Sequence, residues 1–435
     1  MATETPKADA LPDAGELTTT LGKIAEQSQR MVSEFMARQA EQSDSDADPL
    51  NIGDAFLQMT QRMMADPARI AEAQVQLWNG YMTLWQQTAN RMMGQEAEPV
   101  ADPDEDDRRF RDADWNENPV FDFIKQSYLM TSKWMVNTVR ETEGLDDETA
   151  RKVDFYTRQF LDAMAPTNFA ITNPEVLRET VESNGENLIN GLSNLLDDLE
   201  KGNGQLRIKH VDNDAFELGK TVATSPGKVV FQNELFQLLQ FSPLTENVRK
   251  TPVVIVPPWI NKYYILDLRE KNSFIKWATE QGNTVFVVSW VNPDARLATK
   301  TFEDYMIDGP VAAIGAACEA TGADKVNIIG YCIGGTMTAA ALAYMAEKGD
   351  DRVASATFFT TLVDFEEPGE LGVFIDEEQL ASLEEKMGER GYLEGSEMAT
   401  TFSMLRANDL IWSFVINNYL LGKDPFPFDL LFWNS

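Results

Sequence analysis

The stretch between residues 253 and 363 constrains the fold of this chain more than any other feature. It holds four apolar runs, separated by three amphipathic stretches of helical period. The runs predict strands at 253–256, 284–290, 325–331 and 353–363, and the stretches predict helices near 272–281, 302–321 and 334–348. Continuous apolar strands that alternate with helices are typical of a parallel sheet covered on both faces. We therefore predict an α/β domain.

Composition divides the rest of the chain into further segments. The acidic, polar N-terminal part favours a disordered arm with one short helix at 17–38, because few apolar residues are available for a core. Two short strands are expected at 206–211 and 228–231, with Pro226-Gly227 as the turn. The predicted organisation is a disordered arm over 1–50, amphipathic helices and an acidic linker over 51–107, a mostly helical domain over 108–240, an α/β core over 241–365 and a cap insertion over 366–435.

One expected helix in the second segment carries a regular apolar stripe. Asp66 and Pro67 are a typical N-cap and first helical residue, and Gly94 marks the expected end. Apolar residues recur between them in steps of four and three. They are Ala71, Val75, Trp78, Met82, Trp85, Ala89 and Met92. Such a stripe indicates either an internal seam between helices or a surface for a partner chain or an apolar particle, and the sequence leaves both open.

Charge and rare residue types exclude several classes of protein. Because 70 Asp and Glu stand against 37 Lys and Arg, giving a net charge of −33, we expect no nucleic-acid partner. Cys318 and Cys332 are the only cysteines, and neither has metal-ligand spacing around it, which favours a reducing cytosol and no bound metal. The first residues show no secretory signal, and no apolar run reaches the roughly 18 residues of a membrane span. We expect a soluble cytoplasmic protein.

The segment from Gly330 to Gly335, GYCIGG, joins the third expected strand to its helix. A nucleophile on such a turn adopts a strained backbone, and Gly330, Gly334 and Gly335 would let neighbouring chain pack closely around this nucleophile elbow. The helix N-terminus favours a thiolate over a thiol. Cys332 is therefore the candidate nucleophile, and the alternative is a buried cysteine in a tight turn. Cys318 lies in an alanine-rich stretch and is expected to pack inside a helix.

Acyl transfer to a cysteine also requires hydrogen-bond donors for the oxyanion. One donor is expected to be the backbone N–H of Ile333, the residue after the nucleophile. The second should come from the loop after the first strand, where Pro257 and Pro258 have no N–H. The remaining candidates in that loop are Trp259, Ile260 and Asn261.

Several segments resemble polyhydroxyalkanoate synthases. They are VPPWINKYYILD at 256–267, GYCIGGT at 330–336, NDLIW at 408–412, FDLLFWN at 428–434, and Arg108-Arg109-Phe110 with Trp115. The resemblance runs from about residue 107 to the last residue. It implies an α/β-hydrolase-type sheet with an N-terminal helical region and polymerisation of (R)-3-hydroxyacyl-CoA, such as 3-hydroxybutyryl-CoA, into polyester with release of CoA. Cys332 matches the family nucleophile that holds the growing chain as a thioester.

The resemblance further implies a homodimer in the cytoplasm, associated with polyester granules and without a cofactor. The family places its catalytic Asp and His after the cap insertion, and this sequence ends before either position. Its one histidine, His210, precedes the nucleophile and lies in an expected strand, so we expect a structural role for it. We therefore expect a truncated synthase with an incomplete cap, without the last two strands of the sheet and without measurable polymerase activity.

Two alternatives remain open at this point. A cysteine hydrolase on the same fold would pass the acyl group to water, so that product analysis would find free acid in place of polymer. A non-catalytic protein could use the tryptophan-bearing helix to coat a granule or to bind a synthase. Replacement of Cys332 by alanine separates the last alternative from a catalyst, because only a catalyst would lose polymer formation.

Overall fold

The structure is a computed structural model that describes residues 52–204, 206–260 and 262–434. These residues form two compact units, which are described separately. The first contains the described residues up to Lys209, with Glu370–Leu380 and Thr401–Pro425; the second contains His210–Gly369, Ala381–Thr400 and the described residues from Phe426. The division therefore falls at Lys209, whereas composition placed it at residue 240. The predicted arm over 1–50, with its helix at 17–38, lies outside the described residues.

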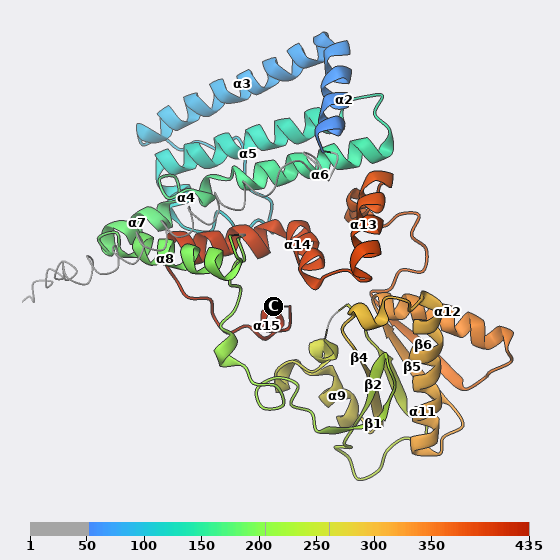
Figure 1. The fold of residues 1–435 in the computed structure, drawn as a ribbon. Helices are drawn as coiled ribbons and strands as arrows, with labels where there is room; N and C mark the ends of the chain where they lie inside the picture. Colours follow the sequence, from blue (N-terminus) through green and yellow to red (C-terminus); the bar gives the residue numbers. More distant parts are fainter. Residues whose placement is uncertain (1–51, 205, 261, 435) are drawn as a thin grey trace, which may run out of the picture. The chain divides into compact units, whose positions relative to one another are not determined.

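Helices make up the first unit, within the part of the chain that the structure describes (Figure 1). Its elements are α2 (Ile52–Ala65), α3 (Pro67–Met92), α4 (Asp114–Glu117), α5 (Pro119–Arg140), α6 (Asp147–Ala163), η1 (Pro166–Asn168), α7 (Pro174–Glu182), α8 (Glu186–Lys201), η8 (Asn408–Trp412) and η9 (Val415–Leu420). Helix α3 confirms its predicted signals: the Asp66 carboxylate accepts the N–H of Arg69, Pro67 is the first helical residue, and Gly94 follows the end with φ +77°.

The apolar stripe of α3 faces solvent, so its interpretation as an internal seam is wrong. Trp78 is 66% exposed and Trp85 is 62% exposed, and Val75, Met82 and Met92 are also exposed. A neighbouring face of the helix meets α5, where Leu84 is buried and Tyr81 hydrogen-bonds Thr131 at 2.8 Å. The Trp134 indole of α5 also donates to the Ala73 carbonyl at 2.9 Å, and the ring of Trp85, a residue of the stripe, packs against Phe123 of α5 at a centroid distance of 5.2 Å. These contacts leave most of the apolar stripe exposed.

The second unit is built on a six-stranded sheet in the order β1-β2-β4-β3-β5-β6 (Figure 1). The strands are β1 (Gly227–Gln232), β2 (Phe236–Phe241), β3 (Val253–Val256), β4 (Val285–Trp290), β5 (Val326–Tyr331) and β6 (Val353–Phe359). Strands β3 to β6 pair in parallel, as predicted, while β2 pairs antiparallel with both β1 and β4. The α/β class is therefore confirmed, with an antiparallel hairpin added at one edge.

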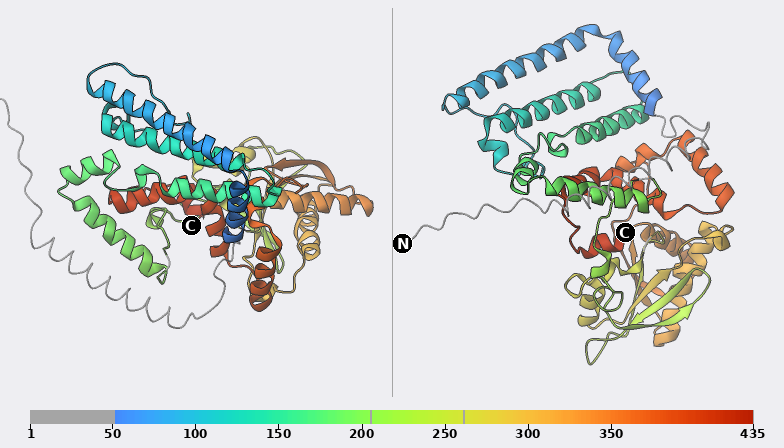
Figure 2. Two further views of the ribbon diagram at one scale, coloured as in Figure 1. Left: turned by 90° about the horizontal axis from the view of Figure 1, so that it is seen from above. Right: turned by 60° about the vertical axis from the view of Figure 1, so that its left-hand side comes forward.

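Helices cover both faces of this sheet. Alternation along the strands sends Val254 and Phe286 into a core with α11 (Ala312–Thr321) and α12 (Ile333–Glu347), whereas Ile255 and Val287 point to the opposite core with α9 (Phe274–Glu280). Figures 1 and 2 show α9 and α11 on opposite sides of the strands. The remaining elements, of which η7, α13 and α14 are divided between the two units, are η2 (Asn213–Ala215), η3 (Tyr263–Leu266), η4 (Glu270–Asn272), η5 (Ala295–Leu297), α10 (Phe302–Met306), η6 (Ile307–Val311), η7 (Gly369–Phe374), α13 (Glu377–Arg390), α14 (Gly395–Leu405) and α15 (Asp429–Asn434).

Three predicted elements differ from the observed ones. Residues 206–211 form no strand, because the backbone N–H and carbonyl of Lys209 bond to the side chains of Asp198 and Asn418. The strand that pairs with β1 is instead β2, and Asn233 closes their turn by accepting the N–H groups of Leu235 and Phe236. The helix expected at 302–321 is interrupted at Gly309 and Pro310 by a π-helical turn. The fourth strand ends at Phe359, before the predicted 363.

Candidate active site

Strand β5 ends at Tyr331, and the next residue, Cys332, is the N-cap of helix α12 and has a positive φ, with φ 53° and ψ −129°. A non-glycine residue with positive φ is uncommon, and such strain recurs where a nucleophile sits on a strand-to-helix turn. Cys332 is exposed to solvent, so the alternative of a buried cysteine in a tight turn is wrong. The structure thus presents this thiol at the carboxyl edge of the parallel strands.

Each of the three elbow glycines lies where a side chain has no room. A Cβ on Gly330 would lie 2.5 Å from the Gly335 Cα, and one on Gly334 would lie 2.5 Å from the Pro257 carbonyl oxygen. A Cβ on Gly335 would collide with the Thr361 side chain, whose Cγ2 would be 2.7 Å away. The first turn of α12 can therefore approach both neighbouring strands only because these residues are glycine.

The backbone of Cys332 is fixed from two sides. Its N–H donates to the Phe359 carbonyl at the end of β6, with an N···O distance of 2.9 Å, and its own carbonyl accepts the N–H of Gly335 at 2.8 Å. The Thr361 hydroxyl donates to the same Phe359 carbonyl at 3.0 Å. The amides of Ile333 and Gly334 belong to the first turn of α12, where a helix has no intrahelical acceptors for them. They provide the positive end of the α12 dipole beside the thiol.

The loop that carries the other oxyanion candidates starts at the same edge of the sheet. Strands β3 and β5 are parallel neighbours, and Val256 is in register with Gly330. The two following turns therefore meet, and Gly334 packs against the carbonyls of Val256 and Pro257. Trp259 is half-buried and Ile260 is exposed in this loop, while Asn261 lies outside the described residues. The elbow and the loop are thus in contact, as an oxyanion hole between them would require.

An aromatic cluster that sequence reasoning missed supports this loop. Trp290, at the end of β4, donates its indole N–H to the Pro257 carbonyl with an N···O distance of 2.8 Å. The Trp259 ring packs against the rings of Trp290, Tyr305 and Phe302 at centroid distances of 5.6 to 6.5 Å. Burial raises the pKa of Tyr305, so its hydroxyl stays protonated at neutral pH. The available signal was a tryptophan that ends β4, the strand next to β3, whose following loop carries the candidate donors.

The far part of the same loop is held by α15. Lys262 donates its ammonium to the Trp433 carbonyl at 2.9 Å, and the Trp433 indole donates to the Lys262 carbonyl at 2.7 Å. Asp429 accepts the N–H of Arg269 at 3.2 Å and the amide of Asn272 at 2.8 Å. Burial alone would raise the pKa of Asp429, but these hydrogen bonds outweigh it, and the pKa is lowered. Residues 428–434 therefore hold this loop in place through hydrogen bonds, a role that the sequence did not suggest.

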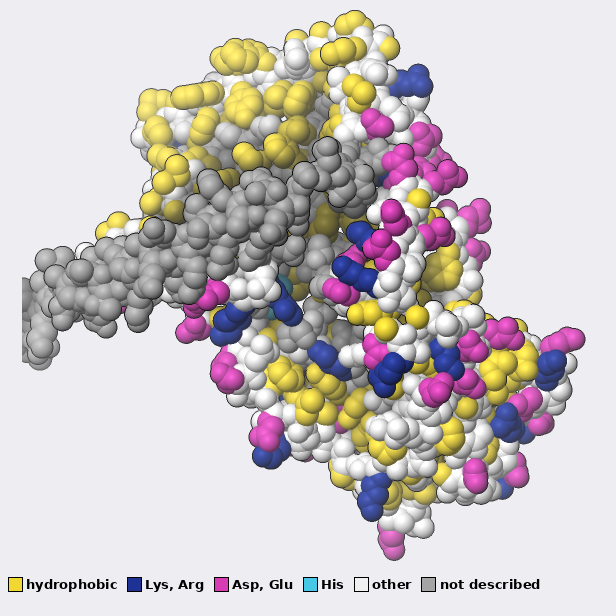
Figure 3. Space-filling view, viewed as in Figure 1, with side chains coloured by type: hydrophobic (Ala, Val, Ile, Leu, Met, Phe, Trp, Pro, Cys, Tyr) yellow, Lys and Arg dark blue, Asp and Glu magenta, His cyan; other side chains and the backbone are white. Residues whose placement is uncertain are grey.

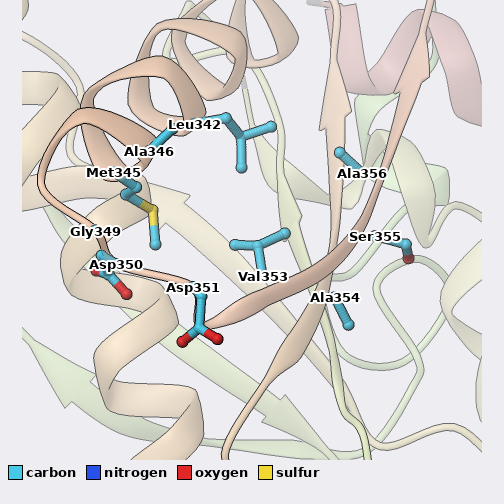
Figure 4. Close-up of a pocket in the computed structure, with 10 residues that line it drawn as sticks. All are labelled: Leu342, Met345, Ala346, Gly349, Asp350, Asp351, Val353, Ala354, Ser355 and Ala356. Carbon is cyan, nitrogen blue, oxygen red and sulfur yellow. The ribbon is translucent and has the colours of Figure 1, made fainter.

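Other candidate groups lie away from the elbow. Cys318 is partly buried on α11, and burial raises the pKa of its thiol, which disfavours a nucleophilic thiolate. His210 is in an irregular segment at the start of the second unit and not in a strand. A hollow of about 480 Å³ lies between the end of α12 and the beginning of β6, lined by residues such as Met345, Asp351 and Val353 (Figure 4). It contains none of the predicted site residues.

Within residues 52–204, 206–260 and 262–434, no cluster of His, Cys, Asp and Glu side chains is arranged to hold a metal ion. Within the same ranges, no helix has both the length and the apolar character needed to cross a membrane.

Comparison with known proteins identifies close relatives. A family model described as the N-terminus of poly-beta-hydroxybutyrate polymerase (PhaC) matches residues 106–278, and an alpha/beta hydrolase fold model matches residues 258–435. The chain is 48% identical over 426 residues to the poly(3-hydroxyalkanoate) polymerase subunit PhaC of Rhizobium meliloti (strain 1021), covering 97% of this chain and 70% of the relative. It is 52% identical over 372 residues to the poly(3-hydroxyalkanoate) polymerase of Methylorubrum extorquens, covering 86% and 62%.

A third relative, the poly(3-hydroxyalkanoate) polymerase subunit PhaC of Cupriavidus necator, is 42% identical over 374 residues, which cover 85% of this chain and 62% of the relative. The chain therefore spans between 62% and 70% of the length of these three curated relatives.

Proposed function

This chain belongs to the poly(3-hydroxyalkanoate) polymerase family, and we propose that it takes part in polymerising (R)-3-hydroxyacyl-CoA thioesters into polyester through an acyl-enzyme at Cys332. The observation that carries the proposal is the strained elbow. Cys332 has φ 53°, is exposed, and opens helix α12 at the edge of the sheet where the β3 loop also begins. A thiol in that position can reach a bound thioester while helix amides face the same space.

The first half-reaction follows from this geometry. The Cys332 thiolate attacks the thioester carbonyl carbon, a new C–S bond forms, and the carbonyl oxygen becomes an oxyanion. The N–H of Ile333 and an N–H of the β3 loop, from Trp259 or Ile260, would stabilise that charge. Collapse breaks the C–S bond to CoA, and the released CoA thiolate takes up a proton from water. Each lost oxyanion donor typically costs about 10²- to 10³-fold in rate.

The second half-reaction extends the chain. The hydroxyl of one hydroxyacyl unit attacks the acyl-thioester of another, and it needs a general base because an alcohol is a weak nucleophile at neutral pH. We assign that role to no residue of this chain, in which His210 is the only histidine. The step that these residues support on their own is acyl-enzyme formation.

We also propose that α3 attaches the protein to the surface of the polyester. Val75, Trp78, Met82, Trp85 and Met92 form an exposed apolar stripe, and Figure 3 shows hydrophobic side chains gathered over this part of the first unit. Residues 52–94 carry three acidic and three basic side chains, so this region is neutral in a chain whose net charge is −33. A neutral apolar face suits an uncharged aliphatic surface and would keep the acidic remainder of the molecule in water.

The acyl-enzyme is tested by incubation with (R)-3-hydroxybutyryl-CoA, with CoA release and intact protein mass as readouts. We expect one equivalent of CoA per chain and one acyl adduct, mapped by proteolysis to Cys332. Cys332→Ala should abolish both signals, while the matched control Cys318→Ala should keep them. Absence of an adduct in the unmodified chain, or its persistence in Cys332→Ala, would refute the proposal. Free 3-hydroxybutyrate released over many turnovers would instead identify a hydrolase.

A further inference from the structure

The Trp290 side chain is placed to control the loop that carries oxyanion donors, although it lies on a different strand. Its strand, β4, is the parallel neighbour of β3 on the side opposite β5. Its indole N–H donates to the Pro257 carbonyl at 2.8 Å, and its ring lies against Trp259 at a centroid distance of 6.5 Å. The side chain therefore contacts the loop at two residues, Pro257 through a hydrogen bond and Trp259 through ring packing.

The effect of this hydrogen bond is enlarged by the two prolines. Pro257 is buried, and the orientation of its carbonyl defines the plane of the peptide that joins it to Pro258. Pro258 has its own φ locked near −65°, so one of the two backbone dihedrals between that plane and the next amide is fixed. That amide belongs to Trp259, and the next to Ile260. One hydrogen bond to the Pro257 carbonyl thus anchors the start of the segment that carries both candidate N–H groups.

The chain makes unusual room for the Trp290 ring. Gly309 is buried, and a Cβ at this position would lie 2.5 Å from the Trp290 Cη2 atom. Its backbone is non-helical, with φ −95° and ψ −105°, and it sits with Pro310 inside the π-helical turn that interrupts 302–321. Such turns in helices are often found at functional sites. The interruption is explained by the ring it accommodates, because a regular helix with a larger residue would displace the indole from Pro257.

We propose that Trp290 is a positioning residue for the oxyanion hole: its indole orients the Pro257–Pro258 peptide and through it the donor N–H groups of the β3 loop. This inference rests on the proposed acyl-enzyme chemistry at Cys332. A positioning role predicts that loss of the indole slows acylation of Cys332 but not its alkylation, whereas a purely structural role predicts no such difference. Acylation passes through an oxyanion and therefore depends on the donors of the loop. Alkylation of the same sulfur forms no oxyanion, so its rate does not depend on the loop.

The test compares both reactions in the full chain and in Trp290→Phe, which keeps an aromatic ring but loses the donor. Acylation is followed with p-nitrophenyl acetate, as the burst of p-nitrophenolate from Cys332, and with (R)-3-hydroxybutyryl-CoA, as CoA release. Alkylation is followed with iodoacetamide between pH 6 and 9. We expect acylation to slow by about tenfold or more, as small misplacements of reacting groups do. The alkylation rate and its pH dependence should stay within about twofold of the unmodified chain.

Two further variants make the result specific. Trp277→Phe changes an exposed tryptophan on α9 and should leave both reactions unchanged. Gly309→Ala keeps the indole donor but pushes the ring, so it should slow acylation in the same way as Trp290→Phe. Equal acylation in Trp290→Phe and the unmodified chain, or a parallel fall of acylation and alkylation, would overturn the assignment. Failure of the unmodified chain to react with the CoA thioester refutes the proposed function instead, since the p-nitrophenyl ester still reports on the loop.

Discussion

A buried ion pair between α6 and the segment before α13 allows a quantitative test of how the first unit is held together. Lys152 and Asp376 are 2.5 Å apart, with side chains only 5% and 7% exposed. Asp376 also accepts the backbone N–H of Gln379 at 2.7 Å and its side-chain amide at 2.6 Å. Lys152→Met would keep the length of the side chain but leave this carboxylate buried without its cation.

The expected loss is about 3–5 kcal/mol in the free energy of unfolding, the usual cost of removing one partner of a buried pair. At 1.4 kcal/mol per tenfold, this corresponds to a shift of about 10²- to 4 × 10³-fold in the folding equilibrium of the first unit. The loss is caused by the unpaired negative charge of Asp376, so adding Asp376→Asn to Lys152→Met should recover most of the lost stability. The asparagine oxygen can still accept from Gln379, and no unpaired charge then remains in the interior.

The pH dependence follows from the pKa of Asp376. Burial raises this pKa, but hydrogen bonds from Lys152 and Gln379 outweigh the effect and lower it below the ordinary value. A carboxyl group with a lowered folded-state pKa contributes stability above its unfolded pKa of about 3.9 and loses it as the pH falls through the folded value. In Lys152→Met the unpaired acid can instead be protonated, so the difference between the two proteins should shrink from pH 7 toward pH 4.

The assay is urea unfolding followed by far-UV circular dichroism and tryptophan fluorescence, at pH 7 and at several lower values. The buried Trp115 of the first unit serves as a local reporter. A loss below about 1 kcal/mol for Lys152→Met at pH 7 would refute the reasoning. So would a double variant no more stable than the single one, because the penalty would then not come from an uncompensated charge.

Two other outcomes are expected. Trp78→Gln with Trp85→Gln should reduce binding to polyester particles at least tenfold in a sedimentation assay while leaving thiol alkylation unchanged; equal binding would remove α3 from the attachment surface. Gly335→Ala should lower stability by about 1–3 kcal/mol through overpacking and slow acylation, because its methyl group meets the Thr361 side chain. Thr361→Gly in the same chain should restore part of both losses, and no recovery would show that the collision is elsewhere.

Local signals in the sequence predicted well what depends on neighbouring residues in the chain. The Asp66 cap, the buried strand Val253–Val256 and the turn around Cys332 are each encoded within a few residues, and the structure has them where predicted. Predictions that needed a distant partner failed. Residues 206–211 have strand-like alternation, yet Lys209 finds its hydrogen-bond partners on Asp198 and Asn418, so no strand forms.

The candidate site divides in the same way. The candidate nucleophile and the following amide could be predicted from GYCIGG, because strand, turn and helix are consecutive there. The residues that support the β3 loop could not be predicted in this way. Trp290 and Trp433 are far from Pro257 in the sequence, and a single tryptophan is not part of a recognisable motif. Likewise, α3 offers two faces that could pack, and its contacts with α5, through Leu84, Tyr81 and the Ala73 carbonyl, decide which face is left mostly exposed.

The sequence by itself determined the alternation of strands and helices, the small residues that shape the elbow, and the residue that opens α12. These follow from backbone sterics and apolar periodicity, which act over a few residues. Tertiary structure alone decided the antiparallel edge at β2, the aromatic support of the β3 loop, and the exposure of the α3 stripe. They depend on contacts between segments far apart in the chain, whose strength comes from burial and hydrogen bonds that exist only once both partners are in place.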